Sequence, residues 1–191
     1  LIFCSFIVFT FLAAIFVFHD KISNFVETLP SDVKRIYAKQ SHYQKIELFQ
    51  FQDNYFLLLN EAIQFDSKME YRYHEALVHP AFALSKNHKN ILVLGGGDGF
   101  AVREILKHSN VEKITLVDLD PEVTQLAKTH PLFITWNKNA LVNSKVQIIN
   151  EDAMSYLKRT SGETQTFDIV IIDFPDPTHI SLGKLYSIEF Y

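Results

Sequence analysis

The chain has 191 residues, 48% of them hydrophobic and 21% charged, which is the composition of a globular protein with a core. Its formal net charge of −4 argues against a nucleic-acid partner, because phosphate binding needs clustered Lys and Arg. A single cysteine, Cys4, excludes an internal disulfide and a cysteine-based metal site. The histidines lack the spacing of metal ligands, so we expect no metal.

Residues 1–18 contain neither a charge nor a proline. As a helix they would span about 27 Å, close to the roughly 30 Å hydrocarbon core of a bilayer. The basic start and small-residue cleavage site of a signal peptide are missing. We therefore predict a transmembrane helix rather than a buried globular one. Residues 19–42 are expected to be a juxtamembrane connector. Its basic excess predicts a cytoplasmic catalytic domain at the inner membrane, multi-pass if an upstream part is missing.

Residues 43–88 predict a small N-terminal domain of strands and a helix. Aromatic and aliphatic residues alternate in part between residues 43 and 65, with turn residues at 52–54 and 60–61. Ser67, followed three residues later by Glu70, predicts a capping box ahead of a helix that runs towards Leu84.

Residues 89–191 predict an α/β domain with a Rossmann-like parallel sheet of the class I methyltransferase type. Four apolar runs, at 91–94, 114–117, 146–149 and 169–172, are separated by helix-like stretches. Strands buried on both faces have this pattern. A doubly wound sheet usually has more strands, and the chain begins with Leu. We therefore expect a piece of a longer protein, with the sheet incomplete at its C-terminus.

A glycine-rich turn follows the first of these strands, with Gly95, Gly97 and Gly99 around Asp98. Glycines permit unusual backbone angles and let a ligand approach the main chain. The turn does not match the dinucleotide-binding motif G-x-G-x-x-G, because Phe100 occupies the position of the last glycine. Asp98 would repel a phosphate but suits a ligand with a positive charge.

All four predicted strands bring an acid to the carboxyl edge of the sheet, where open parallel sheets bind ligands. Asp118, at the end of the second strand, is expected to accept the hydroxyl hydrogens of a ribose, with Asp120 as the alternative. Asp152 follows the third strand and could accept from an adenine amino group. Asp173 and Asp176 follow the fourth. Each acid alone could cap a helix, but together they predict a binding site.

These segments together resemble the polyamine aminopropyltransferases, the spermidine synthase family, and especially its membrane-attached bacterial members. The similarity runs from about Tyr43 to Tyr191 and rests on YQKI, LLLNEAIQ, YHEALVHP, LGGGDG, VREILKH, LVDLDP, EDA, DFPDP and LYSIEFY. It implies a transferase that moves the aminopropyl group of decarboxylated S-adenosylmethionine, a co-substrate, onto a polyamine such as putrescine. The products would be spermidine and methylthioadenosine, and no prosthetic group is implied.

The resemblance also implies roles for single residues, with Asp173 as the proton acceptor. Contacts to the adenosyl co-substrate are implied for Gln44, Gly95, Gly97, Asp98, Gly99, Asp118, Asp152 and Ala153. Contacts to the polyamine are implied for Gln64, Tyr73, His74, Asp98, Asp173 and Asp176. Where the family usually carries Asn-Gly, this chain has Asn60-Glu61, which predicts a wider hairpin turn. Thr178-His179-Ile180 stands in place of a Gly-Pro pair of the family.

Two other functions remain open. An S-adenosylmethionine-dependent methyltransferase shares the sheet, the glycine turn and the ribose acid, but need not carry Asp173 with Asp176. A catalytically silent membrane sensor of polyamines or adenosyl ligands would not need the proton acceptor. The residues also leave a homo-oligomer open.

Overall fold

Two sheets form the framework of residues 30, 32–162, 166–177 and 180–191, the part of the chain that the computed structural model describes. The first sheet is an antiparallel meander in the order β1-β2-β3-β4. Its strands are β1 (Val33–Gln40), β2 (Lys45–Phe51), β3 (Asn54–Leu59) and β4 (Ala62–Asp66). The turns at 52–53 and 60–61 confirm the predicted strand boundaries.

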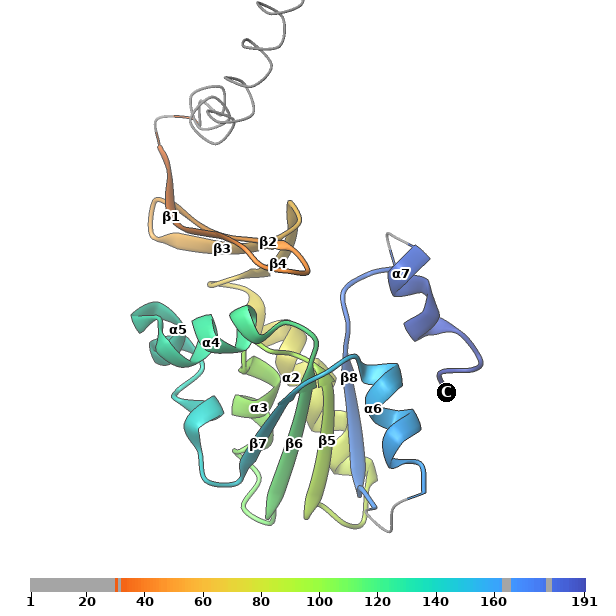
Figure 1. The fold of residues 1–191 in the computed structure, drawn as a ribbon. Coiled ribbons are helices and arrows are strands. Elements are labelled where there is room, and N and C mark those ends of the chain that lie inside the picture. Colours follow the sequence, from red (N-terminus) through yellow and green to blue (C-terminus); the bar gives the residue numbers. More distant parts are fainter. Residues whose placement is uncertain (1–29, 31, 163–165, 178–179) are drawn as a thin grey trace, which may run out of the picture.

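The second sheet is parallel and has the order β7-β6-β5-β8. Its strands are β5 (Asn90–Gly95), β6 (Lys113–Asp118), β7 (Val146–Asn150) and β8 (Ile169–Asp173). This confirms the predicted Rossmann-like sheet. The carboxyl ends of its strands point towards the antiparallel sheet, which lies above them in Figure 1.

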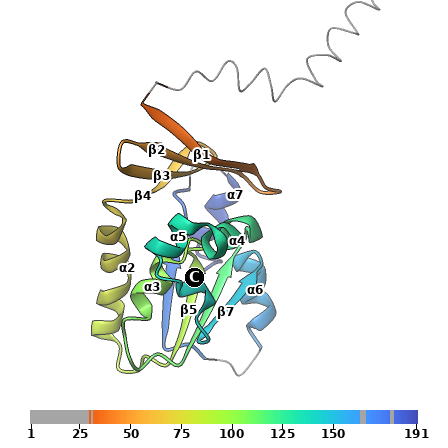
Figure 2. The ribbon, with the colours of Figure 1, turned by 90° about the vertical axis from the view of Figure 1, so that its left-hand side faces the viewer.

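Helices cover both faces of the parallel sheet (Figure 2). On one face lie α2 (Glu70–Leu84) and α3 (Phe100–Ile105), and on the other lies α6 (Ala153–Thr160). The segment between β6 and β7 forms α4 (Pro121–Thr129), α5 (Pro131–Trp136) and the 3-10 helix η1 (Ala140–Val142). After β8 come α7 (Ile180–Gly183) and the 3-10 helix η2 (Lys184–Tyr186).

The continuously apolar sequence of strand β5 is explained by its position in the sheet. Ile91 and Val93 pack into the core beneath α2 and α3, whereas Leu92 and Leu94 pack with Tyr156 of α6. Both faces of the strand are therefore buried, as in sheets built from parallel crossovers. The first core continues into the antiparallel sheet, where the Phe65 ring meets Phe100 edge-on at a centroid distance of 4.9 Å.

The prediction that residues 19–42 form a connector is wrong for the C-terminal part of this range. Strand β1 occupies residues 33–40 and pairs with β2. Strand β1 is an edge strand, and edge strands often carry charged side chains. Lys34 and Lys39 obscured the strand pattern in this way, while Ile36 and Tyr37 pack against the core. The N-terminal sheet thus begins ten residues earlier than predicted.

Two local predictions about turns are also wrong. Helix α2 begins at Glu70 as expected, but no side chain caps it, and the Ser67 hydroxyl binds Asn54 Oδ1 at 2.8 Å. The Asn60-Glu61 hairpin has two loop residues with φ of 47° and 67°, so it is not wider than an Asn-Gly turn. Both angles lie in the left-handed region that a type I′ turn requires.

The predicted transmembrane helix, residues 1–18, lies outside the described residues, as do Thr178 and His179. None of the helices in the described part of the chain combines the length and hydrophobicity that a membrane crossing requires.

Candidate active site

The chain changes direction across the sheet between β5 and β8. From β5 it winds outwards to β6 and β7, and then returns to place β8 on the other side of β5. Open α/β sheets bind ligands at such a switch point, outside the carboxyl ends of the strands. Gly95 pairs directly with Asp173 at this point. The glycine turn and the predicted proton acceptor are therefore neighbours.

Close packing explains the glycines of the turn. A Cβ on Gly95 would lie 2.0 Å from the Asp173 carbonyl oxygen, and one on Gly97 would lie 2.6 Å from the Asp118 carboxylate. Gly99 precedes α3 with φ of +84°, which favours glycine. The turn is thus pressed against the ends of β6 and β8, which brings their acids to one place.

Asp118 and Asp120 have different environments, although only one residue separates them. Asp118 accepts hydrogen bonds from the backbone N–H groups of Gly97 and Asp120, both at 2.9 Å. Burial raises the pKa of Asp118 to about 6, although these two donors lower it. Asp120 is buried, caps α4 through the Glu122 N–H, and accepts from Gln44 Nε2 at 2.9 Å. Asp120 is therefore committed to the fold, whereas the ribose role of Asp118 stays a prediction.

Four predicted polyamine residues meet beside this turn. Tyr73 and His74 come from α2, Asp98 from the glycine turn and Asp173 from the end of β8. Tyr73 Oη donates to Asp173 Oδ1 at 2.8 Å. One polar ring or carboxylate atom each of His74, Asp98 and Asp173 lies within 4.8 Å of the others. This spacing lets all three groups face one ligand.

The electrostatics of this cluster favour a cationic ligand. Burial raises the pKa of Asp98 to about 6 and raises that of Asp173, while the nearby His74 lowers both. Burial lowers the pKa of His74, but its carboxylate neighbours raise it overall. Burial and Asp173 raise the pKa of Tyr73, which keeps its hydroxyl protonated as a donor. Asp98 and Asp173 therefore resist ionisation when no positive charge lies beside them. An ammonium group would supply that charge, so the two acids are suited to bind one.

The remaining predicted residues lie outside this cluster. Asp152 caps α6 by accepting the Ser155 N–H at 3.0 Å, and its other oxygen binds Lys184 Nζ at 2.6 Å. Ala153 is buried next to it. Asp176 is exposed in the loop after β8, and Gln64 is half-buried on β4 with its amide donating to the Ala62 carbonyl.

Sequence reasoning missed three residues around the cluster. Tyr186 donates to the Pro175 carbonyl at 2.9 Å, and the charges of Asp173 and Asp176 help to raise its pKa after burial. Glu70 and Arg103 lie behind His74 and bind each other. Arg103 belongs to the VREILKH segment, and Glu70 was predicted only as part of a capping box with Ser67. Neither pattern predicts their contact.

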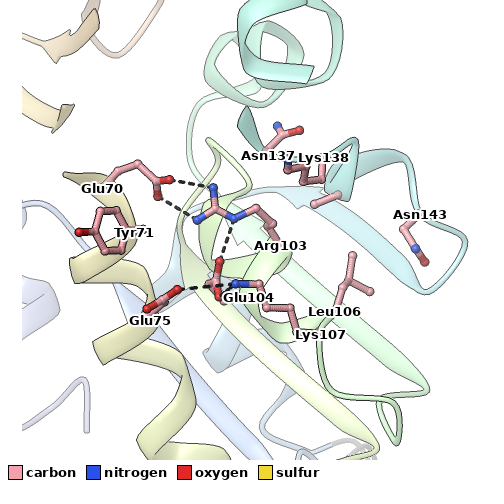
Figure 3. Close-up of a pocket in the computed structure, with 11 residues that line it drawn as sticks. Glu70, Tyr71, Glu75, Arg103, Glu104, Leu106, Lys107, Asn137, Lys138 and Asn143 are labelled. Carbon is pink, nitrogen blue, oxygen red and sulfur yellow. Dashed lines mark hydrogen bonds and ion pairs between the residues drawn. The ribbon is translucent and has the colours of Figure 1, made fainter. Parts of the chain in front are cut away.

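A cavity of about 460 Å³ opens between α2, α3 and residues 137–143 (Figure 3). Arg103 and Lys107 line it, each paired with Glu104. Glu75, His79 and Glu104 also come close enough together to share a metal ion. Lys107 Nζ already binds Glu104 at 2.5 Å, so an ammonium group neutralises that carboxylate.

The profile of the spermine/spermidine synthase domain matches residues 70–191, which is more than half of the chain. The chain belongs to this family. The matched residues include both sides of the switch point, from Tyr73 on α2 to the segment after β8. The predicted resemblance is thereby confirmed, whereas attachment to a membrane stays a prediction.

Curated relatives and solved structures agree with this assignment. A polyamine aminopropyltransferase of Leptospira interrogans is 47% identical over 98% of this chain and 37% of its own length. One of Oceanobacillus iheyensis is 42% identical over 94% and 34%. The chain thus spans about a third of the length of these relatives.

Among solved structures, a spermidine synthase in complex with the transition-state analogue AdoDATO superposes with a TM-score of 0.75 at 33% identity. The spermidine synthase of Thermotoga maritima superposes with a TM-score of 0.72 at 32% identity. Each comparison covers 83% of this chain, and 52% and 51% of the solved chains respectively. Members of the spermine/spermidine synthase family therefore share this fold.

Proposed function

We propose that the protein transfers the aminopropyl group of decarboxylated S-adenosylmethionine to a polyamine such as putrescine, giving spermidine and methylthioadenosine. The observation that supports this most is the meeting of Tyr73, His74, Asp98 and Asp173 beside the glycine turn. This acidic cluster faces the place where a Rossmann-like sheet binds its ligand. Family membership and the names of the relatives point to the same reaction.

The polyamine arrives as a cation, which is a poor nucleophile. An alkylammonium resembles Lys, whose reference pKa is about 10.4, so only about 0.1% or less is neutral at pH 7. Asp98 and Asp173 attract the ammonium and raise its pKa further. The cluster therefore positions the amine but also stabilises its unreactive form. A proton must leave as the attack begins.

Asp173 is placed to accept that proton. Its Oδ1 is held by the Tyr73 hydroxyl, and its Oδ2 faces the glycine turn, 3.0 Å from where a Cβ on Gly96 would lie. The amine nitrogen forms a bond to the aminopropyl carbon next to the sulfonium. The carbon–sulfur bond breaks, its electron pair stays on sulfur, and the ammonium proton passes to Asp173. Alignment of nitrogen, carbon and sulfur contributes much of the rate.

The nucleoside half of the co-substrate would lie along the ends of β6 and β7. Asp118 would accept from the ribose, with Gln44 close to the loop that follows it. Asp152 and Ala153 would meet the adenine, which requires Asp152 to exchange its contact with Lys184 for the adenine amino group. Gly95 and Gly97 let the turn pack against Asp173 and Asp118, and this turn, with Gly99, would contact the co-substrate.

The outer parts of the site remain proposals from the sequence. Asp176 would anchor the distal ammonium of the polyamine, and Gln64 would line the pocket from β4. Residues 1–18 would hold the protein in the inner membrane with its catalytic domain on the cytoplasmic side. Association into a homo-oligomer is a further expectation.

Product analysis tests the proposed reaction. The full-length protein is incubated with decarboxylated S-adenosylmethionine and a panel of diamines and polyamines, and the products are identified by mass. We expect an aminopropylated amine and methylthioadenosine in equal amounts, and no transfer when S-adenosylmethionine replaces the co-substrate. A methylated product would instead indicate a methyltransferase, and ligand binding without turnover would indicate a sensor.

A further inference from the structure

His74 is held from behind by one residue of its own helix. Its Nδ1 lies 2.8 Å from the Glu70 carbonyl oxygen and 2.9 Å from Glu70 Oε2. Both oxygens are acceptors, so Nδ1 must carry the hydrogen. The ring is 3% exposed and packs against Phe100 at a centroid distance of 5.1 Å. Glu70 therefore determines the tautomer of His74 and helps to orient its ring.

Glu70 is in turn held by Arg103 of α3. The guanidinium binds it through Nη1–Oε1 at 2.8 Å and Nη2–Oε2 at 3.0 Å, a two-point contact (Figure 3). Arg103 is itself fixed by Glu104 Oε1 at 2.8 Å and by the Trp136 carbonyl at 2.9 Å. Such planar pairing restricts both side chains more than a lysine contact would. The pair thus links α2 to the helix that begins at the glycine turn.

We propose that Glu70 and Arg103 are positioning residues that hold His74 against Asp98 and Asp173 and thereby control the charge of the acids that handle the amine. This inference rests on the proposed aminopropyl transfer. Neither residue needs to touch the substrate. Their effect passes through His74, the one group of the cluster that can carry a positive charge when the amine is absent.

The charges that face His74 give the sign of the effect. Glu70 faces it from α2, Asp98 from the glycine turn and Asp173 from β8. Burial lowers the pKa of His74, and these three carboxylates raise it overall. Without the charge of Glu70, His74 loses its proton at a lower pH. Asp173 then loses a neighbouring cation, so it binds a proton at a higher pH. At Asp98 the loss of the His74 charge acts in the same direction, but it is opposed because the negative charge of Glu70, which raises the pKa of Asp98, is also gone.

The decisive variant is Glu70→Gln in the full-length protein, with kcat measured from pH 5 to 8. We expect the acidic limb of the kcat profile to move up by about one pH unit, which is about a tenfold loss of turnover on that limb. KM for the adenosyl co-substrate should change little, because Asp118, the proposed ribose acceptor, lies at the end of β6 rather than on α2 or β8. A purely structural role would lower turnover by the same factor at every pH.

Two further variants keep the test interpretable. Glu75→Gln makes the same chemical change on the same helix, but Glu75 is exposed and its carboxylate lies 3.8 Å from Lys107 Nζ. It should keep the wild-type pH profile. The double variant Glu70→Gln, Arg103→Met also removes the guanidinium that has lost its two-point contact with a carboxylate, so it guards against simple misfolding of the single variant. The acidic limb of its kcat profile should move to higher pH as in the single variant.

A measurement that does not depend on turnover separates this inference from the proposed function. The ring protons of His74 are titrated by NMR, and we expect a lower pKa in Glu70→Gln and in the double variant than in the wild type and Glu75→Gln. A wild type without transferase activity would refute the proposed function, while the titration still tests the link to His74. An unchanged His74 titration, or an unmoved acidic limb in an active protein, would overturn the inference.

Discussion

At Asp173 one carboxylate oxygen accepts the Tyr73 hydroxyl, and the other faces the glycine turn. At Asp120 both oxygens are taken by donors of the protein itself, from Ser41, Gln44 and the start of α4. The same side chain can therefore serve chemistry at one position and structure at another. At the residue scale, these donors commit Asp120 to the fold, whereas the environment of Asp173 suits the proposed proton transfer.

Replacement of Asp173 by Asn tests its role as the base. The amide keeps the size of the side chain and can still accept from Tyr73, but it cannot take up the amine proton. Turnover should fall by about 10²–10⁴-fold, the usual contribution of a general base. Affinity for methylthioadenosine, measured by calorimetry, should change little. Raising the pH should restore part of the rate, since more amine is then neutral. Near-normal turnover at pH 7 would remove Asp173 from the mechanism.

Asp98 should make the ligand-free protein less stable as the pH rises. Burial raises its pKa to about 6 in the folded state, from an ordinary value of 3.8. The folded state therefore binds the proton more tightly than the unfolded chain does. The resulting stabilisation is complete below about pH 3.8 and is lost as the pH rises through about 6.

Asp98→Asn removes this dependence and keeps an acceptor for the Phe100 N–H. We expect the variant to match the wild type near pH 4 and to be about 1–2 kcal/mol more stable at pH 7.5, allowing for partial exposure of the carboxylate. Urea unfolding at several pH values measures the difference. A constant difference across this range would show that ionisation of Asp98 is not its cause.

At the scale of elements, the hairpin between β3 and β4 shows how a turn keeps its shape without glycine. Asn60 has φ of 47°, and its side-chain oxygen accepts the Lys45 N–H at 2.9 Å, which ties the turn to the start of β2. Glu61 has φ of 67°. A left-handed backbone costs a residue with a Cβ about 1–2 kcal/mol. The strand register therefore imposes the conformation of Glu61.

Glu61→Gly should relieve that strain and raise the free energy of unfolding by about 0.5–1 kcal/mol, because the greater freedom of glycine in the unfolded chain offsets part of the gain. Thermal or urea unfolding provides the measurement. Glu61→Ala is the matched control, since it removes the same charge but keeps a Cβ at the same positive φ. Equal stabilisation by both variants would point to charge rather than backbone strain.

At the scale of the whole molecule, the two sheets form one framework around the site. Phe65 of β4 packs edge-on against the Phe100 and Phe133 rings, with centroid distances of 4.9 and 5.6 Å. Gln44, at the start of β2, reaches Asp120 beyond the end of β6. The antiparallel sheet therefore covers the carboxyl edge of the parallel sheet and closes one side of the candidate site.

The proposed membrane anchor is tested with the intact protein. If residues 1–18 span the bilayer, the protein should stay in the membrane fraction after alkaline carbonate washing, which removes peripheral proteins. A transmembrane helix buries about 20 apolar residues in lipid, and a change of pH or salt does not reverse this. Full recovery of the intact protein in the supernatant would exclude a spanning helix.

The sequence by itself determined the parallel sheet, the glycine turn and the row of acids at the strand ends. These features follow from local patterns, because a strand buried on both faces must be apolar along its length and parallel strands must end at one edge. The edge strand β1 escaped this reasoning, since its charged residues interrupt the pattern.

Only the tertiary structure decided which groups face one another. Tyr73 binds Asp173 across 100 positions of sequence, and Glu70 binds Arg103 across 33. The local pattern assigned Glu70 to a cap with Ser67, but the guanidinium of α3 offers a two-point, charge-assisted contact that a neutral backbone N–H cannot match. Such partners depend on how the crossovers bring α2, α3 and β8 together, and sequence spacing does not encode that geometry.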